Sequence, residues 1–180
     1  MKGIVFTEFL EMVEETFGLE TVDYIITNSN LESRGAYTAV GTYDFGEMLR
    51  LVTNLSEKVN TPVNDLLYVY GTYFFNALIT NHPEIFKQFK HPIALLSSIE
   101  DHIHVHVRKI YPGAELPTFT ILHEDDTSIT MIYESSRSLY RFAHGLMQKT
   151  FEYYKREASI IVEKIKEDGS EVKFIASYNE

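Results

Sequence analysis

The first part of the chain repeats apolar residues with the period of an α-helix. Between residues 6 and 17 they recur at Phe6, Phe9, Leu10 and Val13, the spacing of one helical face, and Gly18 ends the pattern. Further helices are expected over residues 21–27, 43–59 and 61–79, in a short stretch from residue 83, and over residues 92–110. Asp44 is the expected N-cap of the third of these helices. Thr61-Pro62 predicts a capping threonine followed by proline at the first helical position.

After Tyr111-Pro112-Gly113 the pattern changes to that of β-strands. Residues 118–122 and 128–134 are rich in β-forming residues, and a turn-prone stretch over 123–126 separates them. A helix is expected over 137–154, followed by strands over 159–166 and 171–177 that form a hairpin about Asp168-Gly169. Helices followed by antiparallel strands predict an α+β fold. We expect a four-stranded antiparallel sheet with one inserted helix, in a single domain that covers residues 1–180.

The charge balance and the opening of the chain limit the partners and the compartment. Lys and Arg total 16 against 26 Asp and Glu, so the formal net charge is −10. Such a charge repels nucleic acid and anionic membrane surfaces, and neither is expected as a partner. The chain has no apolar run near the ~20 residues that cross a bilayer. Its opening turns acidic where a signal peptide needs an apolar core. We expect the protein in the cytoplasm.

The sequence contains no cysteine, which removes several kinds of metal and cofactor site. Disulfides, iron–sulfur clusters, cysteine zinc sites, thiolate-ligated haem and covalently attached haem are all excluded. The 12 Phe and 12 Tyr residues are sufficient to line a large flat cofactor, but they suit an ordinary core equally well.

Three histidines, at positions 102, 104 and 106, fall within the helix expected over residues 92–110. Residues two apart on a helix point about 200° apart, so these three cannot converge on one metal, although one of them could be an axial haem ligand. Helical periodicity places His106 at the centre of the apolar face with Ile103 and Ile110, and His104 near its edge. From the pattern alone we choose His106 as the more buried. An ordinary core or surface histidine is the alternative for either.

The segment from Tyr133 to Arg137 is a second candidate site. Alternation along a strand would put Tyr133, Ser135 and Arg137 on one face. A phenol, a hydroxyl and a guanidinium that point together can hold a carboxylate or phosphate, which arginine binds bidentately. The alternative is a solvated strand end. The sequence contains no Walker or dinucleotide-binding pattern and no recognisable nucleophile with its base, so it does not indicate an enzyme.

Taken together, these residues resemble the H-NOX family, the haem-nitric oxide/oxygen binding domains related to the haem domain of soluble guanylate cyclase. The resemblance covers essentially all 180 residues. It depends on the opening Met1-Lys2-Gly3-Ile4-Val5, His104 seven residues before Tyr111-Pro112, Pro117, and the motif formed by Tyr133, Ser135 and Arg137.

The resemblance implies a role for each of these residues around a b-type haem buried between the helices and the sheet. His104 matches the proximal histidine that ligates the iron, which overrules the choice of His106 from periodicity. The clamp on the haem propionates matches Tyr133, Ser135 and Arg137. Pro117 matches the proline that presses on the porphyrin and distorts it. Ile4 and Val5, from the opening motif, are expected to contact the haem.

The resemblance also predicts the ligand. The distal tyrosine of the oxygen-binding members falls at Phe142 here, and the neighbouring pocket positions are Phe9 and Phe74. None of the three phenylalanines has a hydrogen-bond donor for oxygen. Nitric oxide needs no such donor, so the expected ligand is nitric oxide, with carbon monoxide as a ligand in vitro.

Stand-alone members of the family typically act on a histidine kinase or a diguanylate cyclase. With 180 residues and no output domain, the chain is expected to signal to such a partner in trans. The alternatives are an oxygen-binding or redox haem protein of the same fold, a haem enzyme such as a peroxidase, and a haem-free interaction module.

Overall fold

The computed structural model of the protein describes residues 1–179. The helices are α1 (Ile4–Phe17), α2 (Leu19–Asn28), α3 (Phe45–Val59), α4 (Val63–Asn81), α5 (Pro83–Lys87), α6 (Pro92–Ser97), the π-helical turn η1 (Ile99–Ile103), α7 (His104–Ile110) and α8 (Tyr140–Tyr153). The strands are β1 (Thr118–Glu124), β2 (Ser128–Glu134), β3 (Ala158–Lys164) and β4 (Glu171–Tyr178). The predicted α+β class and the antiparallel sheet with an inserted helix are confirmed.

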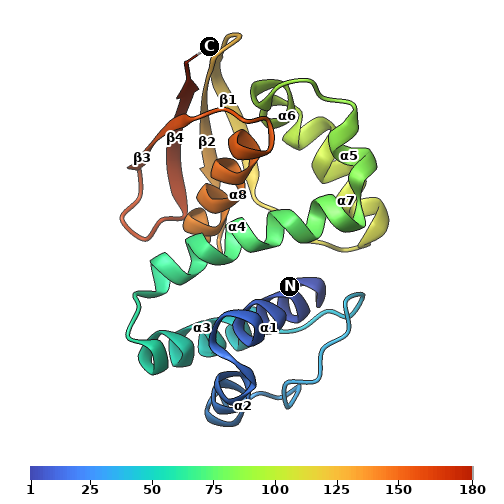
Figure 1. Ribbon diagram of the computed structural model, residues 1–180, viewed down its shortest axis with the longest axis vertical. Helices are drawn as coiled ribbons and strands as arrows, with labels where there is room; N and C mark the ends of the chain where they lie inside the picture. Colours follow the sequence, from blue (N-terminus) through green and yellow to red (C-terminus); the bar gives the residue numbers. More distant parts are fainter. Residues whose placement is uncertain (180) are drawn as a thin grey trace.

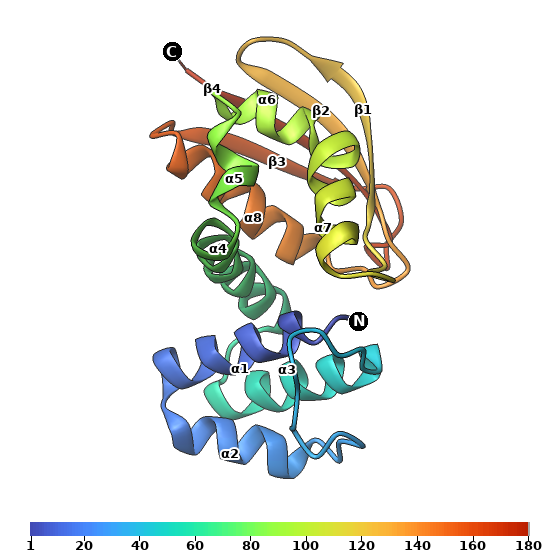
Figure 2. The ribbon, with the colours of Figure 1, turned by 90° about the vertical axis from the view of Figure 1, so that its right-hand side faces the viewer.

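The sheet has the order β1-β2-β4-β3, and one of its faces is buried. Alternate residues of β2 and β4 point inward and lie opposite one another, as in the pairs Met131–Phe174 and Tyr133–Val172. Helices α6 and α8 cover this face (Figure 2). Gly169, with φ +76°, turns the chain between β3 and β4, in agreement with the predicted Asp168-Gly169 turn.

Helices α1, α2 and α3 form a separate layer on the side of α4 opposite the sheet (Figure 1). Fully buried side chains such as Phe6, Ile25 and Leu51 hold this layer together. The terminal ammonium of Met1 donates to the carbonyl of Tyr43 at 2.8 Å, which fixes the start of the chain beside α3. The long helix α4 is therefore the element between the α1–α3 layer and the sheet.

Two glycines allow α4 and α8 to cross with their backbones in contact. A Cβ atom on Gly71 would lie 2.2 Å from the carbonyl oxygen of Phe142, and one on Gly145 would lie 2.2 Å from that of Tyr68. Larger residues at these positions would separate the helices. This close approach holds Phe142 of α8 against the aromatic face of α4, where its ring lies 5.4 Å from that of Phe74.

The helix starts differ in detail from the prediction. Helix α4 begins at Val63, with Pro62 rather than Thr61 in the capping position, and the Thr61 hydroxyl donates instead to the carbonyl of Val59. Asp44 does precede α3, but its side chain makes no capping hydrogen bond. Helix α8 begins at Tyr140 rather than at residue 137, because residues 135–138 form a turn with Ser138 at φ +53°.

The helix expected over residues 92–110 is interrupted, which corrects the prediction for the histidines. The carbonyl of Ser98 accepts from the amides of both His102 and Ile103, and the turn that follows is π-helical. A π-turn adds one residue, so later residues are rotated by about 100° relative to an unbroken α-helix. The choice of His106 as the more buried histidine is wrong. The His104 side chain is 9% exposed, whereas the His106 side chain is 36% exposed.

Within the described residues, no helix combines the length and the apolar character that a membrane crossing requires.

Candidate functional site

A cavity of about 260 Å³ lies between α4, α7 and the sheet, with α1 closing one side. Its walls are almost entirely apolar. The residues that bear on function are Ile4 and Val5 of α1, Tyr70 and Phe74 of α4, His104 of α7, Pro117 just before β1, Phe119 of β1, Tyr133, Ser135 and Arg137 at the end of β2, and Phe142 of α8. The cavity therefore joins elements from both ends of the chain.

His104 is the buried histidine of this wall, and a hydrogen-bond relay fixes its ring. Its Nδ1 lies 3.0 Å from Oε1 of Glu100, one helical turn earlier, and the same oxygen accepts from the backbone amide of Phe119 at 2.9 Å. Because Nδ1 is occupied, Nε2 is the nitrogen that remains for a metal. Burial lowers the pKa of His104 despite the nearby Glu100 carboxylate, which favours the neutral, metal-binding form.

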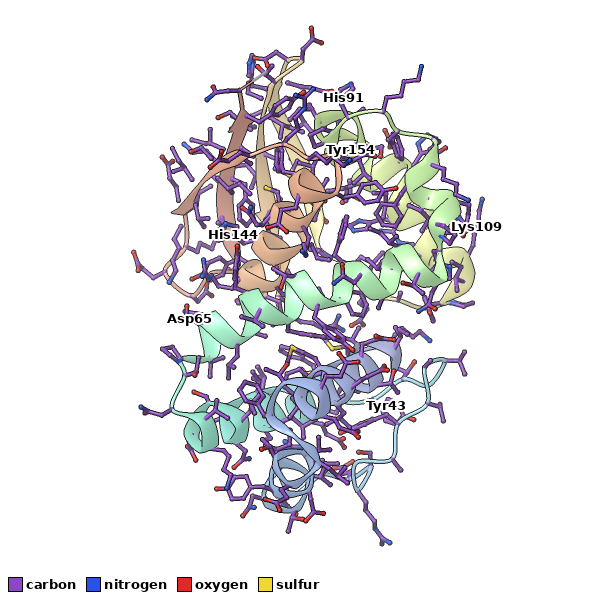
Figure 3. The ribbon with its side chains drawn as sticks, in the orientation of Figure 1. Tyr43, Asp65, His91, Lys109, His144 and Tyr154 are labelled. Carbon is purple, nitrogen blue, oxygen red and sulfur yellow. The ribbon has the colours of Figure 1, made fainter. Side chains whose placement is uncertain are left out.

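The other two histidines of this segment are outside the cavity. His102 is exposed, and Nε2 of His106 lies 3.2 Å from Oε1 of Glu84. Lys109, also on α7, lies at the outer edge of the molecule (Figure 3). The two sides of α7 are therefore chemically distinct, with one imidazole directed inward and another outward.

The predicted triad of Tyr133, Ser135 and Arg137 does meet at the cavity, but for a different reason from the one expected. Strand β2 ends at Glu134, so Ser135 and Arg137 lie in the following turn, where the Arg137 amide donates to Ser135 Oγ at 3.2 Å. Nη1 of Arg137 donates to the carbonyl of Glu115 at 2.8 Å and Nη2 to its carboxylate. The guanidinium therefore already binds a carboxylate, the same group that a haem propionate carries.

The wall formed by α4 and α8 is aromatic. Phe74 and Phe142 both contact the ring of Tyr70, at centroid distances of 5.8 and 5.0 Å. Phe9 does not line the cavity. It lies behind Tyr70, with its ring 5.2 Å away, and is fully buried in the core of the α1–α3 layer.

Tyr70 is the wall residue that sequence reasoning missed. Its hydroxyl donates to the carbonyl of Val5 at 2.6 Å, and burial raises its pKa well above the usual value. The donor is thus already used within the protein. Its position four residues before Phe74 was an available signal, because residues i and i+4 share a helical face.

The polar neighbours of Phe142 point away from the cavity. Arg141 pairs with Asp65 at 3.6 Å and donates to His144 at 2.9 Å, and Figure 3 shows Asp65 and His144 on the opposite side of the molecule from Lys109. The Tyr140 ring lies beneath Lys164 of β3. Neither Arg141 nor Tyr140 therefore contributes a donor to the wall formed by Phe74 and Phe142.

These observations fit a haem held by one axial histidine. His104 offers a neutral imidazole oriented by the Glu100 carboxylate. Tyr133, Ser135 and Arg137 form a polar corner suited to propionates, and the remaining walls are apolar, as the porphyrin requires. Pro117, Ile4 and Val5 belong to the same walls, as expected for residues in contact with the ring.

Comparison with known proteins agrees with this fit. A family model described as haem-NO-binding matches residues 2–162. The chain is similar to the H-NOX protein of K. algicida, solved in the Fe(II) unliganded state, with 56% identity over 100% of this chain and 97% of that chain, and a TM-score of 0.97. It is also similar to the H-NOX of Shewanella woodyi, solved bound to IWP-051 in the Fe(II)CO state, with 40% identity, coverage of 99% and 95%, and a TM-score of 0.83.

A more distant likeness supports the fold alone. The H-NOX protein of S. oneidensis, solved in the Fe(II)NO state, is 24% identical over 100% of both chains, with a TM-score of 0.92. No curated protein matches the chain. The family model and the identity to the K. algicida protein together establish the relationship. The chain belongs to the haem-NO-binding, or H-NOX, family of haem-based gas sensors.

Proposed function

We propose that this protein is a cytoplasmic sensor of nitric oxide, formed by one domain over residues 1–180, in which His104 ligates the iron of haem b. The observation that carries the proposal is the pairing of His104, oriented by Glu100, with a cavity whose aromatic wall offers no free donor. When bound, the haem supplies a ferrous iron that takes diatomic gases as ligands.

The residues of the aromatic wall account for the proposed discrimination against oxygen. Oxygen gains partial negative charge as a ligand and depends on a hydrogen-bond donor, whose effect is strong in a dry pocket. Phe74 and Phe142 have no donor, and the Tyr70 hydroxyl is held by Val5. Nitric oxide needs little such help, and carbon monoxide is the expected second ligand in vitro.

The polar corner is the proposed site for the propionates. Arg137 donates through Nη2 to the Glu115 carboxylate and through Nη1 to the Glu115 carbonyl, and the same two donors could bind a propionate bidentately. Burial raises the pKa of Tyr133, so its phenol stays protonated and able to donate. Pro117 is the proposed contact that distorts the porphyrin.

The proposed signal passes through α7 to a partner in trans, a histidine kinase or a diguanylate cyclase. Helix α7 carries His104 and lies in the cavity wall together with α1, from the opposite layer of the molecule. Nitric oxide that weakened the bond between His104 and the iron would free α7 to shift relative to Pro117, which would press on the porphyrin. A shift of this helix would change a surface that a partner can recognise.

The first prediction concerns ligand choice. The spectrum of the ferrous protein should change on addition of nitric oxide, whereas air should leave it unliganded or slowly oxidise it. Phe142→Tyr should strengthen oxygen binding by about 5- to 12-fold, since one hydrogen bond is worth about 1–1.5 kcal/mol. Tyr140→Phe is the control and should change neither result. A stable oxygen-dependent spectrum in the unmodified protein would contradict the proposed selectivity.

The second prediction concerns the iron ligand. His104→Gly should lose haem, or keep it only with added imidazole, because the neutral imidazole of the cavity wall is gone. His106→Ala should keep the normal haem spectrum, because His106 faces Glu84 instead. Absorption spectra of both purified variants decide the matter, and the opposite pattern would refute the assignment of His104.

The third prediction concerns the propionate clamp. Arg137→Ala should release haem to apomyoglobin about 10- to 100-fold faster, because a hydrogen bond to a charged group is worth about 1.5–3 kcal/mol. Arg141→Ala provides the matched control, since it removes a partly exposed arginine that binds Asp65 away from the cavity. Equal release rates for the two variants would show that the propionates bind elsewhere.

The fourth prediction concerns signalling. The activity of a physically associated kinase or cyclase should differ by at least about 5-fold between the unliganded and nitric oxide-treated protein at equal concentration. With the His104→Gly variant, loaded with haem and imidazole, the partner's activity should no longer respond to nitric oxide, because the iron is then not bonded to α7. Signalling in trans is refuted if neither form of the unmodified protein alters the partner.

A further inference from the structure

A second group of side chains that could bind a metal lies where α7 meets the junction of α4 and α5. His82 caps the end of α4, Glu84 belongs to the short helix α5, and His106 projects from α7. Oε1 of Glu84 lies 3.2 Å from Nε2 of His106 and 3.6 Å from Nδ1 of His82. The three possible ligand atoms all lie within 4.8 Å of one another. Segments 22 or more residues apart thus meet at one point.

Two imidazoles and a carboxylate form a common ligand set for a divalent transition metal, with water as the usual fourth ligand. Bonds of about 2.0–2.1 Å in a tetrahedron put neighbouring ligand atoms about 3.3 Å apart. The distances from Glu84 to the two histidines already lie close to this value. The two imidazole nitrogens lie within 4.8 Å of each other, so they would need to approach by up to about 1.5 Å.

In this group of three side chains, His82 is held in place by packing, whereas the Glu84 carboxylate is free to adjust. The His82 side chain is 18% exposed and its ring packs edge-on against Tyr111 at 6.4 Å. Glu84 is 57% exposed, so its carboxylate can adjust and a fourth ligand can enter from solvent. The rings of His82 and His106 already pack edge-on against each other at 6.2 Å.

We propose that His82, Glu84 and His106 bind a divalent transition metal ion of the zinc type, separate from the haem iron. The site would join α7 directly to the corner between α4 and α5. It uses the outward face of the helix whose inward face carries His104, and it requires neither haem nor a gas ligand.

The test is calorimetric titration of Zn²⁺ into the haem-loaded, chelator-washed full chain. One equivalent should bind, and Co²⁺ at the same site should give the visible absorption bands of four-coordinate cobalt. Glu84→Gln and His106→Ala should each weaken Zn²⁺ binding by at least about 100-fold, because each removes one of three ligands. His82 is left unchanged, because it also lines the haem cavity.

His123→Ala is the matched control. His123 pairs with Asp125 at 3.2 Å and is exposed, but this pair lacks a second imidazole, so the variant should bind Zn²⁺ normally. The haem spectrum of each variant shows whether it has folded, independently of zinc binding. The proposal is overturned if the unmodified chain binds no Zn²⁺. It is also overturned if folded Glu84→Gln and His106→Ala bind Zn²⁺ as tightly as the unmodified chain.

Discussion

The π-helical turn before α7 determines what each histidine of this helix can do. The Ser98 carbonyl accepts two amides, and the added residue turns His104 into the cavity and leaves His106 facing Glu84. In an unbroken helix the two residues would be rotated by about 100° from these positions. Both the proposed iron site and the proposed zinc-type site therefore depend on the same irregular turn. π-turns often occur at functional sites, where such a rotation is useful.

The architecture could be predicted from the sequence because its signals are local. The helical period of the first part, the β-rich runs after residue 113 and the Asp168-Gly169 turn each act over a few residues, and together they indicated the α+β class. The π-turn could not be predicted in this way. The Ser98 hydroxyl donates to the carbonyl of Leu95, a local bond that many serines near helix ends make and that does not by itself specify a π-turn. A change of hydrogen-bond partner by one residue leaves no mark on apolar periodicity.

The candidate site shows the same division between local and long-range information. The motif from Tyr133 to Arg137 was recognised, but strand alternation is not the reason that its side chains meet, because the strand ends at Glu134. The position of Phe9 behind Tyr70 depends on how α1 packs against α4. The Tyr70 hydroxyl is held by a residue 65 positions away. Such contacts are set by tertiary packing, which a single sequence does not reveal.

One oxygen of Glu100 serves both the His104 imidazole and the backbone amide of Phe119. The two donors compete for the same negative charge, so the electron density available at the imidazole and the docking of β1 are thermodynamically linked. A force that draws the first residues of β1 away from Glu100 would strengthen the bond to Nδ1 and make the ring a better electron donor. By reciprocity, a change in the electron demand on this ring alters how firmly the edge of the sheet is held. The strength of the hydrogen bond that holds β1 to Glu100 would therefore change with the electron demand on His104, and no direct contact between this strand and a bound gas is needed.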